Sequence, residues 1–330
     1  MDLEELTQHL SSKKSKFLIF LLGLSIFGIA LLGSSESFTY SKVSNNLSNY
    51  TVTSGKSFNS ILNEFSLNPI EIVLLKIFLK RNSLNIVQAG HYDLTNKSWR
   101  DFLLSIANGD VVIFKLNIPA GKNLYEIEKI ISDSRLNNDC DDFECLNVRF
   151  KFLEGTLKPD TYFYKDLSSA ANILKKSQDE FFKLASTLWS NKNTVLPLKN
   201  LSEAIILASI VEKEAGNDLE KPIIAGVFLH RISIGMRLQA DPTIIYGLLP
   251  DFNGNITKAN LKDKKNPYNT YQISGLPPTP ISTISKSSLE AVILGMRNDY
   301  LYFVAKGDGT HKFSKTYKEH LEAVKKYQLN

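Results

Sequence analysis

The chain has 330 residues, of which 39 are Lys or Arg and 34 are Asp or Glu, so its formal net charge at pH 7 is +5. So mild a positive excess suits an anionic polymer or a membrane surface without requiring either one. The sequence also lacks a concentrated basic patch of the kind that binds nucleic acid, so we expect no nucleic-acid partner.

The N-terminal segment predicts a membrane anchor. Residues 17–33 are free of charge, and their number is at the lower limit for crossing a hydrocarbon core of ~30 Å. Lys13, Lys14 and Lys16 precede this run, so the positive-inside rule keeps residues 1–16 in the cytoplasm and exports the rest. A cleaved signal peptide is the alternative. Because the run exceeds a usual signal-peptide core and no clear A-x-A site follows, we expect an uncleaved helix.

Residues 34–47, rich in Ser and Asn, are expected to be a linker from the membrane. Beyond them, residues 52–61 resemble residues 118–127, because each has a short strand, a Gly-Lys turn, a Ser or Asn helix cap and an apolar helix start. Between these segments we expect a helix at residues 69–80, a strand at 91–94, a helix at 99–107 and a strand at 111–116. Residues 48–117 are thus similar to a LysM-like module, a βααβ unit that binds N-acetylglucosamine polymers. A plain α+β spacer domain would show the same pattern.

The remainder, residues 118–330, predicts one further α+β domain. Its helices are expected at about residues 123–132, 167–187, 200–214, 219–234 and 286–296, and a strand is expected at 300–305. The turn Gly307–Thr310 follows that strand, as in a β-hairpin. The fold class we expect is therefore α+β, with a single N-terminal transmembrane helix.

The two cysteines, Cys140 and Cys145, are separated by four residues in an acidic polar stretch. In an oxidising compartment they could close a small disulfide loop, and two free thiols are the alternative. A metal site would need more ligands, and the five histidines are scattered without an H-E-x-x-H motif, so we expect no metal. Phosphate-binding and dinucleotide-binding motifs are missing from the sequence as well, so no cofactor is expected.

A buried helix ending in two glutamates is the strongest chemical signal. Residues 201–211 are apolar on most of the helix circumference, and Glu212 and Glu214 follow at its end. Burying an ionisable carboxyl is costly unless it is paired, hydrogen-bonded or protonated. A carboxyl that stays protonated near neutral pH is suited to be a general acid. The structural alternative is that both glutamates mark the point where the helix leaves the core.

Four loops in the same domain are rich in Pro, Tyr, Asn, Gln and Asp. They comprise residues 153–162, 236–246, 266–271 and 275–281. Flat aromatic side chains with amide and carboxylate neighbours suit sugar rings, because apolar ring faces stack while hydroxyl groups take hydrogen bonds. Each loop alone is more often a rigid turn or a capped helix start. Asp241, for example, is expected to be an N-cap with Pro242 at the first helical position.

Six motifs follow one another between about residues 150 and 325. They are LEGTLKPDTY, ASIVEKEAG, VFLHRISIGMRLQADPTIIYG, NPYNTY, GLPPTPI and YLYFVAKGDGTHKFSKTYKEH. In this order they closely resemble the YceG-like family, the endolytic murein transglycosylases. The resemblance implies a bacterial inner-membrane protein that cuts peptidoglycan strands near their site of synthesis. Lys158, His230, Thr279 and Leu321 depart from the family pattern, which leaves details of the grip on the substrate open.

The resemblance also places the catalytic acid at the second glutamate, Glu214. The helix alone does not choose between the two, since residues two apart lie about 200° apart around it and face nearly opposite ways. Glu212 is then a structural or supporting group. The motifs supply candidate substrate-binding residues, ranked by motif membership alone: Glu154, Gln239, Asp241, Tyr246, Asn269, Tyr271 and His311.

The activity implied by the resemblance is cleavage of the bond between N-acetylmuramic acid and N-acetylglucosamine. It leaves 1,6-anhydro-N-acetylmuramic ends and terminates glycan elongation at the plasma membrane, without a cofactor. The implied partners are peptidoglycan glycan strands and peptidoglycan synthases. Two other functions fit the sequence. One is a non-catalytic glycan-binding scaffold of the cell-wall synthesis machinery, and the other is a true hydrolase.

Overall fold

The computed structural model describes residues 3–43, 47–296 and 298–329. The chain divides into two compact units, residues 1–114 and residues 115–330. The predicted tail, 1–16, and the predicted linker, 34–47, each lie partly outside the described residues. A hydrophobic core fills each unit, and helices and strands both contribute to the fold, as expected for an α+β protein.

Two short strands and three helices form the body of the first unit. They are β1 (Asn49–Val52), α2 (Phe58–Asn63), α3 (Pro69–Arg81), β2 (Gly90–Asp93) and α4 (Trp99–Asn108). The strands pair antiparallel, with Tyr50 opposite Tyr92, so β1, α2, α3 and β2 make a βααβ unit. Tyr92, Trp99 and Phe102 are almost fully buried in its core.

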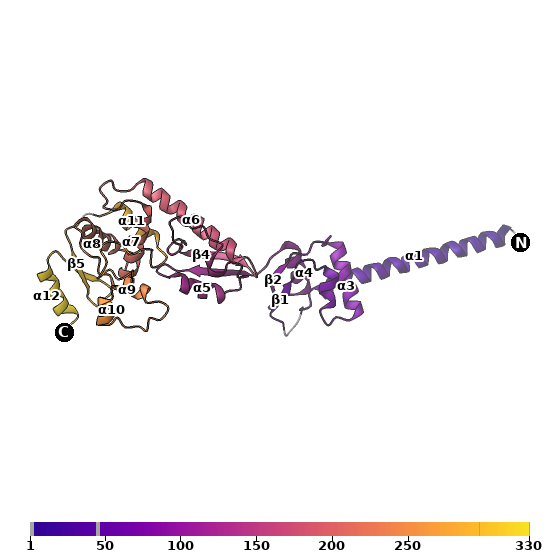
Figure 1. Ribbon diagram of the computed structural model, residues 1–330. Coiled ribbons are helices and arrows are strands. Elements are labelled where there is room, and N and C mark those ends of the chain that lie inside the picture. The colour runs from indigo at the N-terminus through magenta and orange to yellow at the C-terminus, as the bar shows by residue number, and fades with distance from the viewer. Residues whose placement is uncertain (1–2, 44–46, 297, 330) are drawn as a thin grey trace. The chain divides into compact units, whose positions relative to one another are not determined.

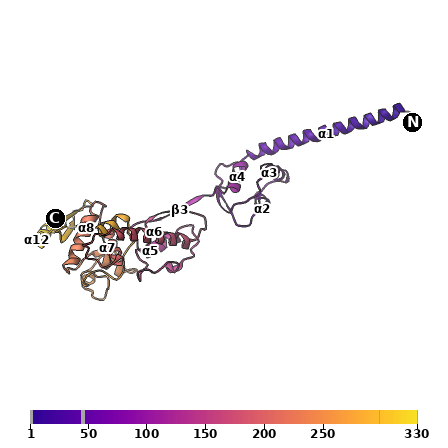
Figure 2. The ribbon, with the colours of Figure 1, turned by 90° about the horizontal axis from the view of Figure 1, so that it is seen from above.

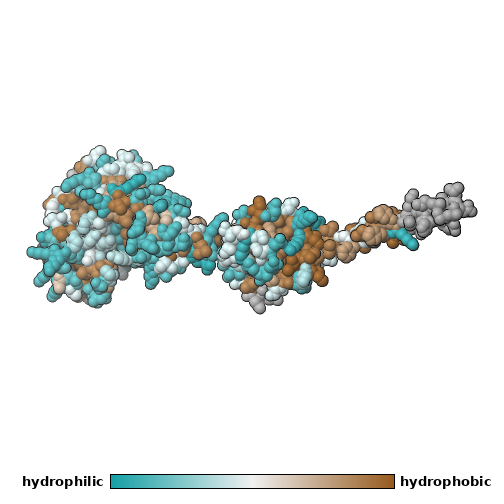
Figure 3. All heavy atoms as spheres, turned by 45° about the vertical axis from the view of Figure 1, so that its right-hand side comes forward, coloured by the Kyte–Doolittle hydropathy of each residue, from teal (hydrophilic) through white to brown (hydrophobic). Residues whose placement is uncertain are grey.

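Helix α1 (Leu3–Thr39) runs unbroken from the N-terminal side of this unit (Figures 1 and 2). Within the described residues, its segment Ser15–Thr39 is the one helix long and apolar enough to cross a membrane. Most side chains between residues 17 and 34 are exposed, and the space-filling view shows much of this segment in brown (Figure 3). The segment therefore suits a single membrane-spanning helix.

The helix continues through residues 34–39, where the sequence suggested a linker. The Ser35 hydroxyl donates a 2.7 Å hydrogen bond to the Leu74 carbonyl of α3, and Thr39 is fully buried. Glu36 forms ion pairs with Arg81 and Arg100. Contacts with α3 and α4 thus override the local preference of a Ser-rich stretch for loop structure, and the first unit is joined to α1 without a flexible break at this point.

The two predicted capping segments are confirmed. Ser57 accepts from the Ser60 N–H to cap α2, and Asn123 accepts from the Glu126 N–H to cap the helix that begins at Leu124. The turn before each cap contains a glycine with positive φ, +84° at Gly55 and +76° at Gly121, a conformation that glycine adopts at little steric cost. The same sequence pattern, a glycine turn followed by a Ser or Asn N-cap, therefore forms a strand–turn–helix corner in both units.

The second unit is larger and mostly helical. Its elements are β3 (Ile113–Ile118, which begins at the division between the units), α5 (Leu124–Ser132), the 3₁₀ turn η1 (Asp141–Phe143), β4 (Asp160–Lys165), α6 (Ala170–Ser190), α7 (Leu201–Glu214), α8 (Lys221–Ser233), α9 (Asp241–Gly247), α10 (Lys258–Lys262), α11 (Lys286–Leu294), β5 (Tyr302–Ala305), β6 (His311–Ser314) and α12 (Tyr317–Tyr327). Strand β3 pairs with β4, and β5 pairs antiparallel with β6. Helices α7, α8 and α11 pack on one another around the core (Figure 1).

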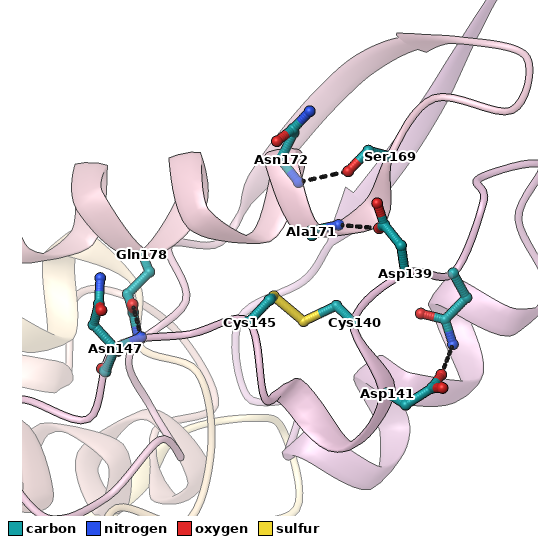
Figure 4. The surroundings of a disulfide bond; sticks show 10 residues. Asp139, Cys140, Asp141, Cys145, Asn147, Ser169, Ala171, Asn172 and Gln178 are labelled. Carbon is teal, nitrogen blue, oxygen red and sulfur yellow. Dashed lines mark hydrogen bonds between the residues drawn. A yellow bond between two sulfur atoms is a disulfide. The ribbon is translucent and has the colours of Figure 1, made fainter.

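Cys140 and Cys145 are joined by a disulfide beside the N-terminus of α6 (Figure 4). The bond closes a small loop that contains η1. On one side of the loop, Asp139 Oδ1 accepts a 2.8 Å hydrogen bond from the Ala171 N–H. On the other, the Asn147 N–H donates to Gln178 on the same helix. The loop is therefore fastened to α6 at both ends.

Candidate active site

Helix α7 places two carboxyl groups at the end of a buried helix. Asn200 caps its start by accepting from the Glu203 N–H, and every residue from Ala204 to Val211 is buried. The helix ends at Glu214, because Ala215 takes an extended conformation. The last turn of a helix carries partial negative charge, which disfavours a carboxylate there unless other groups compensate for it.

Glu212 has such compensation. Its Oε2 accepts hydrogen bonds from the Ser285 N–H at 3.0 Å, the Ser285 hydroxyl at 2.5 Å and the Ser288 hydroxyl at 2.6 Å. Lys221 Nζ lies 3.3 Å from its Oε1, and the two side chains are only 7% and 10% exposed. Burial acts to raise the pKa of Glu212, but the serine hydrogen bonds and Lys221 outweigh it and lower that pKa below the usual value. The ionised carboxylate therefore ties together α7, α8 and α11.

Glu214 lies in the opposite kind of environment. Burial raises the pKa of its carboxyl to about 8, the negative charge of Asp241 adds to the rise, and the positive charge of Arg231 opposes it. Among the described residues, none donates a hydrogen bond to this carboxyl, and the residue keeps partial exposure to solvent. A carboxyl that holds its proton near neutral pH has the property required of a general acid.

Asp241 and Tyr271 meet beside Glu214. The Tyr271 hydroxyl donates a 2.7 Å hydrogen bond to Asp241 Oδ1 across 30 positions of sequence. The expected N-cap role of Asp241 is wrong, because the cap of α9 is Ala240 and Asp241 is already the first helical residue. Burial, followed by the contact with Asp241, raises the pKa of Tyr271, which keeps its phenol protonated as a donor. Both residues are at least partly exposed, so a ligand can reach them.

Arg231 is a site residue that the sequence motifs did not single out. It lies on α8, is 6% exposed, and donates to the carbonyls of Leu301 and Leu238 at 2.7 and 2.5 Å. Its charge acts on both Glu214 and Tyr271. A buried arginine on a mostly apolar helix is rare enough to be a signal, and it could have drawn attention to this position.

Gln239 lies two residues before Asp241 and is exposed. Its backbone has φ +49°, a left-handed conformation that is uncommon for a residue other than glycine. The N–H of Gln239 donates to the Thr270 carbonyl, which joins the loop before α9 to the loop that carries Tyr271. Backbone strain of this kind gathers at ligand-binding sites, and an exposed amide here remains a suitable sugar contact.

Glu154 and Tyr246 are joined by a hydrogen bond within the second unit. Glu154 is 4% exposed and its carboxyl accepts from the Leu124 N–H, the Gly155 N–H and the Tyr246 hydroxyl at 3.1, 3.2 and 3.0 Å. Burial raises the pKa of Glu154 to about 7 against the lowering effect of these donors. The ring of Tyr246 packs edge-on against Tyr268 at 4.8 Å between centroids. A carboxyl this buried does not suit the predicted contact with a sugar. Its hydrogen bonds instead fix the positions of α5 and α9.

Asn269 also holds a loop rather than facing solvent. Its side chain is fully buried, and its amide donates to the backbone carbonyls of Asn260, Leu261 and Asp263 at 3.0, 3.3 and 2.7 Å. Its Oδ1 accepts from the Tyr271 N–H. This burial and these hydrogen bonds do not suit the direct contact with a sugar that the motif predicted for Asn269. The residue acts by fixing the backbone of Tyr271.

His311 starts β6 and is held by a carboxylate from the segment that follows α7. Its N–H and Nδ1 lie 2.9 and 2.7 Å from the two carboxylate oxygens of Glu220. The Asn217 amide donates to the Gly309 carbonyl at 3.1 Å. That carbonyl lies where a side chain on Gly216 would be, 2.5 Å from its Cβ position, so glycine is required for this close approach. The β5–β6 turn thus packs beside the end of α7.

The residues that meet here come from four distant motifs. Glu214, Arg231, Asp241 and Tyr271 act on one another electrostatically, and the His311 hairpin adjoins the residues just after Glu214. Across the described ranges, no group of three or more His, Cys, Asp or Glu side chains is arranged to hold a metal ion. The arrangement provides one protonated carboxyl with a neighbouring carboxylate, a phenol and a guanidinium.

The chain is similar to known proteins over most of its length. The family model of the YceG-like family matches residues 50–326. An "Endolytic murein transglycosylase" of Bacillus subtilis (strain 168) is 29% identical over 336 residues, covering 92% of this chain and 91% of that protein. One of the same name from Streptococcus pneumoniae serotype 2 is 27% identical over 276 residues, covering 71% of this chain and 49% of its own length. The chain therefore spans about half the length of the pneumococcal relative.

A solved structure agrees with the sequence comparison. The 2.6 Å crystal structure of a yceG-like protein from Listeria monocytogenes has 30% sequence identity and a TM-score of 0.54, and the match covers 83% of this chain and 97% of that one. The family model spans most of the chain, including α7, the Asp241 loop and the β5–β6 hairpin. The chain belongs to the YceG-like family.

Proposed function

We propose that this protein is a membrane-anchored endolytic murein transglycosylase that cleaves nascent peptidoglycan strands and so terminates their elongation. Its relatives carry the name of that activity, and it belongs to their family. The observation that carries the proposal is the environment of Glu214, a partly exposed residue whose carboxyl has its pKa raised to about 8 by burial and by Asp241. At neutral pH this carboxyl has a proton to give.

The reaction needs one group that first donates and then accepts a proton. Protonated Glu214 donates to the oxygen that links N-acetylmuramic acid to N-acetylglucosamine, and the bond from C1 to that oxygen breaks. The C6 hydroxyl of the same muramic residue then attacks C1 and forms the 1,6-anhydro ring. The proton of that hydroxyl passes to the Glu214 carboxylate, which restores the acid. Water is not consumed, and nothing is oxidised or reduced.

Positioning supplies much of the rate, because the nucleophile belongs to the same sugar as the reacting carbon. Exposed or partly exposed groups around Glu214 are the candidates to hold that sugar. Gln239, Asp241, Tyr271 and His311 meet this condition. Tyr246 is partly exposed, but its hydroxyl is taken up by Glu154, so its contribution is to shape the site through its ring.

The remaining assignments concern the membrane and the glycan. In this proposal α1 spans the membrane once, with residues 1–16 in the cytoplasm and everything that follows the apolar run on the outer side. Lys13, Lys14 and Lys16 before the apolar run support that orientation. Residues 48–117 act as a LysM-like module on N-acetylglucosamine polymers, which the order and pairing of β1, α2, α3 and β2 support. Peptidoglycan synthases, which make the substrate strands, are the proposed partners.

Two matched variants test the proposal on purified glycan strands. Glu214→Gln keeps the shape of the side chain but has no acidic proton, so cutting should fall by roughly 10²–10⁴ or more, since general acid–base help is worth that much. Glu212→Gln, the control on the same helix turn, should cut at a rate much closer to that of the wild type. A chelator should leave the wild-type rate unchanged. Equal loss of cutting in both variants, with both folded by circular dichroism, would refute the assignment to Glu214.

A further inference from the structure

The charge-free part of α1 ends where α1 packs against α3. Lys16 and Glu36 bracket residues 17–35, which carry no charge. At 1.5 Å per residue these positions span about 28 Å, close to the ~30 Å thickness of a hydrocarbon core. With α1 across the membrane, as proposed above, Ser35 and Glu36 lie at the outer boundary between hydrocarbon and water.

Two interactions fix α3 beside Ser35 and Glu36, at the end of the charge-free part of α1. The buried Ser35 hydroxyl donates to the Leu74 carbonyl at 2.7 Å, in the middle of α3. Glu36 lies 3.4 Å from the Arg81 guanidinium at the end of α3. Because these contacts leave α3 little freedom to move away along α1, α3 must sit beside the boundary that Ser35 and Glu36 mark.

The free side of α3 has the composition of a helix that lies in such a boundary. Ile70 is 72% exposed and Val73 is 50% exposed. Lys76 and Lys80 follow on the same side, at spacings of three or four residues, and are exposed as well. In Figure 3 apolar surface also gathers on the first unit next to α1. Apolar side chains with neighbouring lysines are typical of interfacial helices, whose lysine heads reach anionic headgroups.

We propose that α3 is seated in the outer membrane–water interface, with Ile70 and Val73 inserted at the level of the acyl-chain ends nearest the headgroups and Lys76 and Lys80 beside lipid phosphates. This inference rests on the proposed spanning role of α1, and it adds a second membrane contact. Lipid is the occupant that the structure favours because the exposed stripe is continuous with the membrane segment and is basic. The first unit is then fixed against the bilayer at a set height.

The test uses full-length protein in vesicles of phosphatidylcholine and phosphatidylglycerol. Single cysteines replace Ile70 or Val73 and carry the fluorophore NBD, while Cys140 and Cys145 remain joined and unreactive. Leu18→Cys, inside the apolar run, is the positive control. Leu219→Cys, which is 88% exposed in the second unit, is the negative control. The quencher is a lipid with a nitroxide near the headgroup end of its acyl chain.

The proposal expects the labels at positions 70 and 73 to be quenched several-fold more strongly than the label at 219. A quenched label at 18 with unquenched labels at 70 and 73 would overturn it and leave the anchor intact. If the label at 18 also escapes quenching, the anchor itself is absent, and both proposals fall. If the NBD emission at positions 70 and 73 shifts to the blue without quenching, protein rather than lipid covers the stripe. That result also overturns the proposal.

Discussion

Glu212 and Glu214 lie two residues apart on α7, and their surroundings move the pKa values of their carboxyl groups in opposite directions. Burial acts to raise both pKa values, but at Glu212 the hydrogen bonds of Ser285 and Ser288 reverse its effect. At Glu214 the charge of Asp241 reinforces it, and the pKa reaches about 8. Pairs of carboxyls separated in this way have divided roles in acid–base enzymes. Here one is suited to structure and the other to proton transfer.

Replacing Asp241 with Asn should shift the pH dependence of cutting. The charge of Asp241 raises the pKa of Glu214, so its removal lowers that pKa and reduces the protonated fraction at neutral pH. The alkaline limb of kcat/KM, which reports the acid of the free enzyme, should therefore move to lower pH. The exposed Asp251→Asn variant is the control and should leave the limb in place. An unchanged limb in Asp241→Asn would show that Asp241 does not tune the acid.

Glu214→Gln should stabilise the protein against alkaline pH. The pKa of Glu214 is about 8 in the folded protein against an ordinary 4.5, so its contribution to stability is full below pH 4.5 and is lost as pH rises through about 8. Glutamine does not ionise and avoids that loss. The melting temperature of Glu214→Gln should therefore exceed that of the wild type by more at pH 9 than at pH 5. Parallel melting curves at the two pH values would contradict the raised pKa.

Glu212→Gln should weaken the fold. The variant loses one of the two carboxylates that pair with buried Lys221, and the other, Asp218, is mostly exposed. Glutamine can still accept from Ser285 and Ser288, so the free energy of unfolding should fall by about 2–3 kcal/mol. Glu290→Gln, at a more exposed ion pair on α11, is the control and should change stability by less than about 0.5 kcal/mol. Denaturant titration measures both. Equal, small losses would mean that the Glu212 network contributes little.

Removing the disulfide should lower stability without affecting chemistry. The loop between Cys140 and Cys145 is short, and the chain-entropy model gives about 2 kcal/mol for closing it. The double variant Cys140→Ser/Cys145→Ser should melt a few degrees earlier and cut strands at the wild-type rate where it is folded. A folded double variant with reduced cutting would instead connect this loop to the active site.

Local signals in the sequence were enough to predict most of the helices. Periodic apolar residues and polar caps predicted α3, α5 and α7 within a residue or two of their observed bounds. Helix α12 was missed, although Thr316 and Glu319 form a capping box that could have predicted it. The helical conformation of residues 34–39 could not be seen locally, because it depends on contacts of Ser35 and Glu36 with other helices.

The site shows the same division between local and distant information. The sequence singled out Glu212 and Glu214. Ser285, whose hydrogen bonds lower the pKa of Glu212 alone, lies 73 positions away from Glu212. Asn269 belongs to a Tyr-rich and Asn-rich loop of the kind that suits sugars, and nothing in that loop reveals that its side chain is buried against backbone carbonyls. Burial and partnership depend on the assembled fold, so motif membership alone could not separate binding residues from those that hold the loops.

Cutting glycan strands in water enriched in ¹⁸O shows whether Glu214 works with the sugar's own hydroxyl or with water. Asp241 is a second carboxylate near Glu214, as in hydrolases that activate water, so the products decide between the two mechanisms. If the sugar's own hydroxyl is the nucleophile, the products should be 1,6-anhydro-N-acetylmuramic ends without ¹⁸O, lighter by one water than reducing ends, and nearly absent with Glu214→Gln. Reducing ends that carry ¹⁸O would contradict that mechanism.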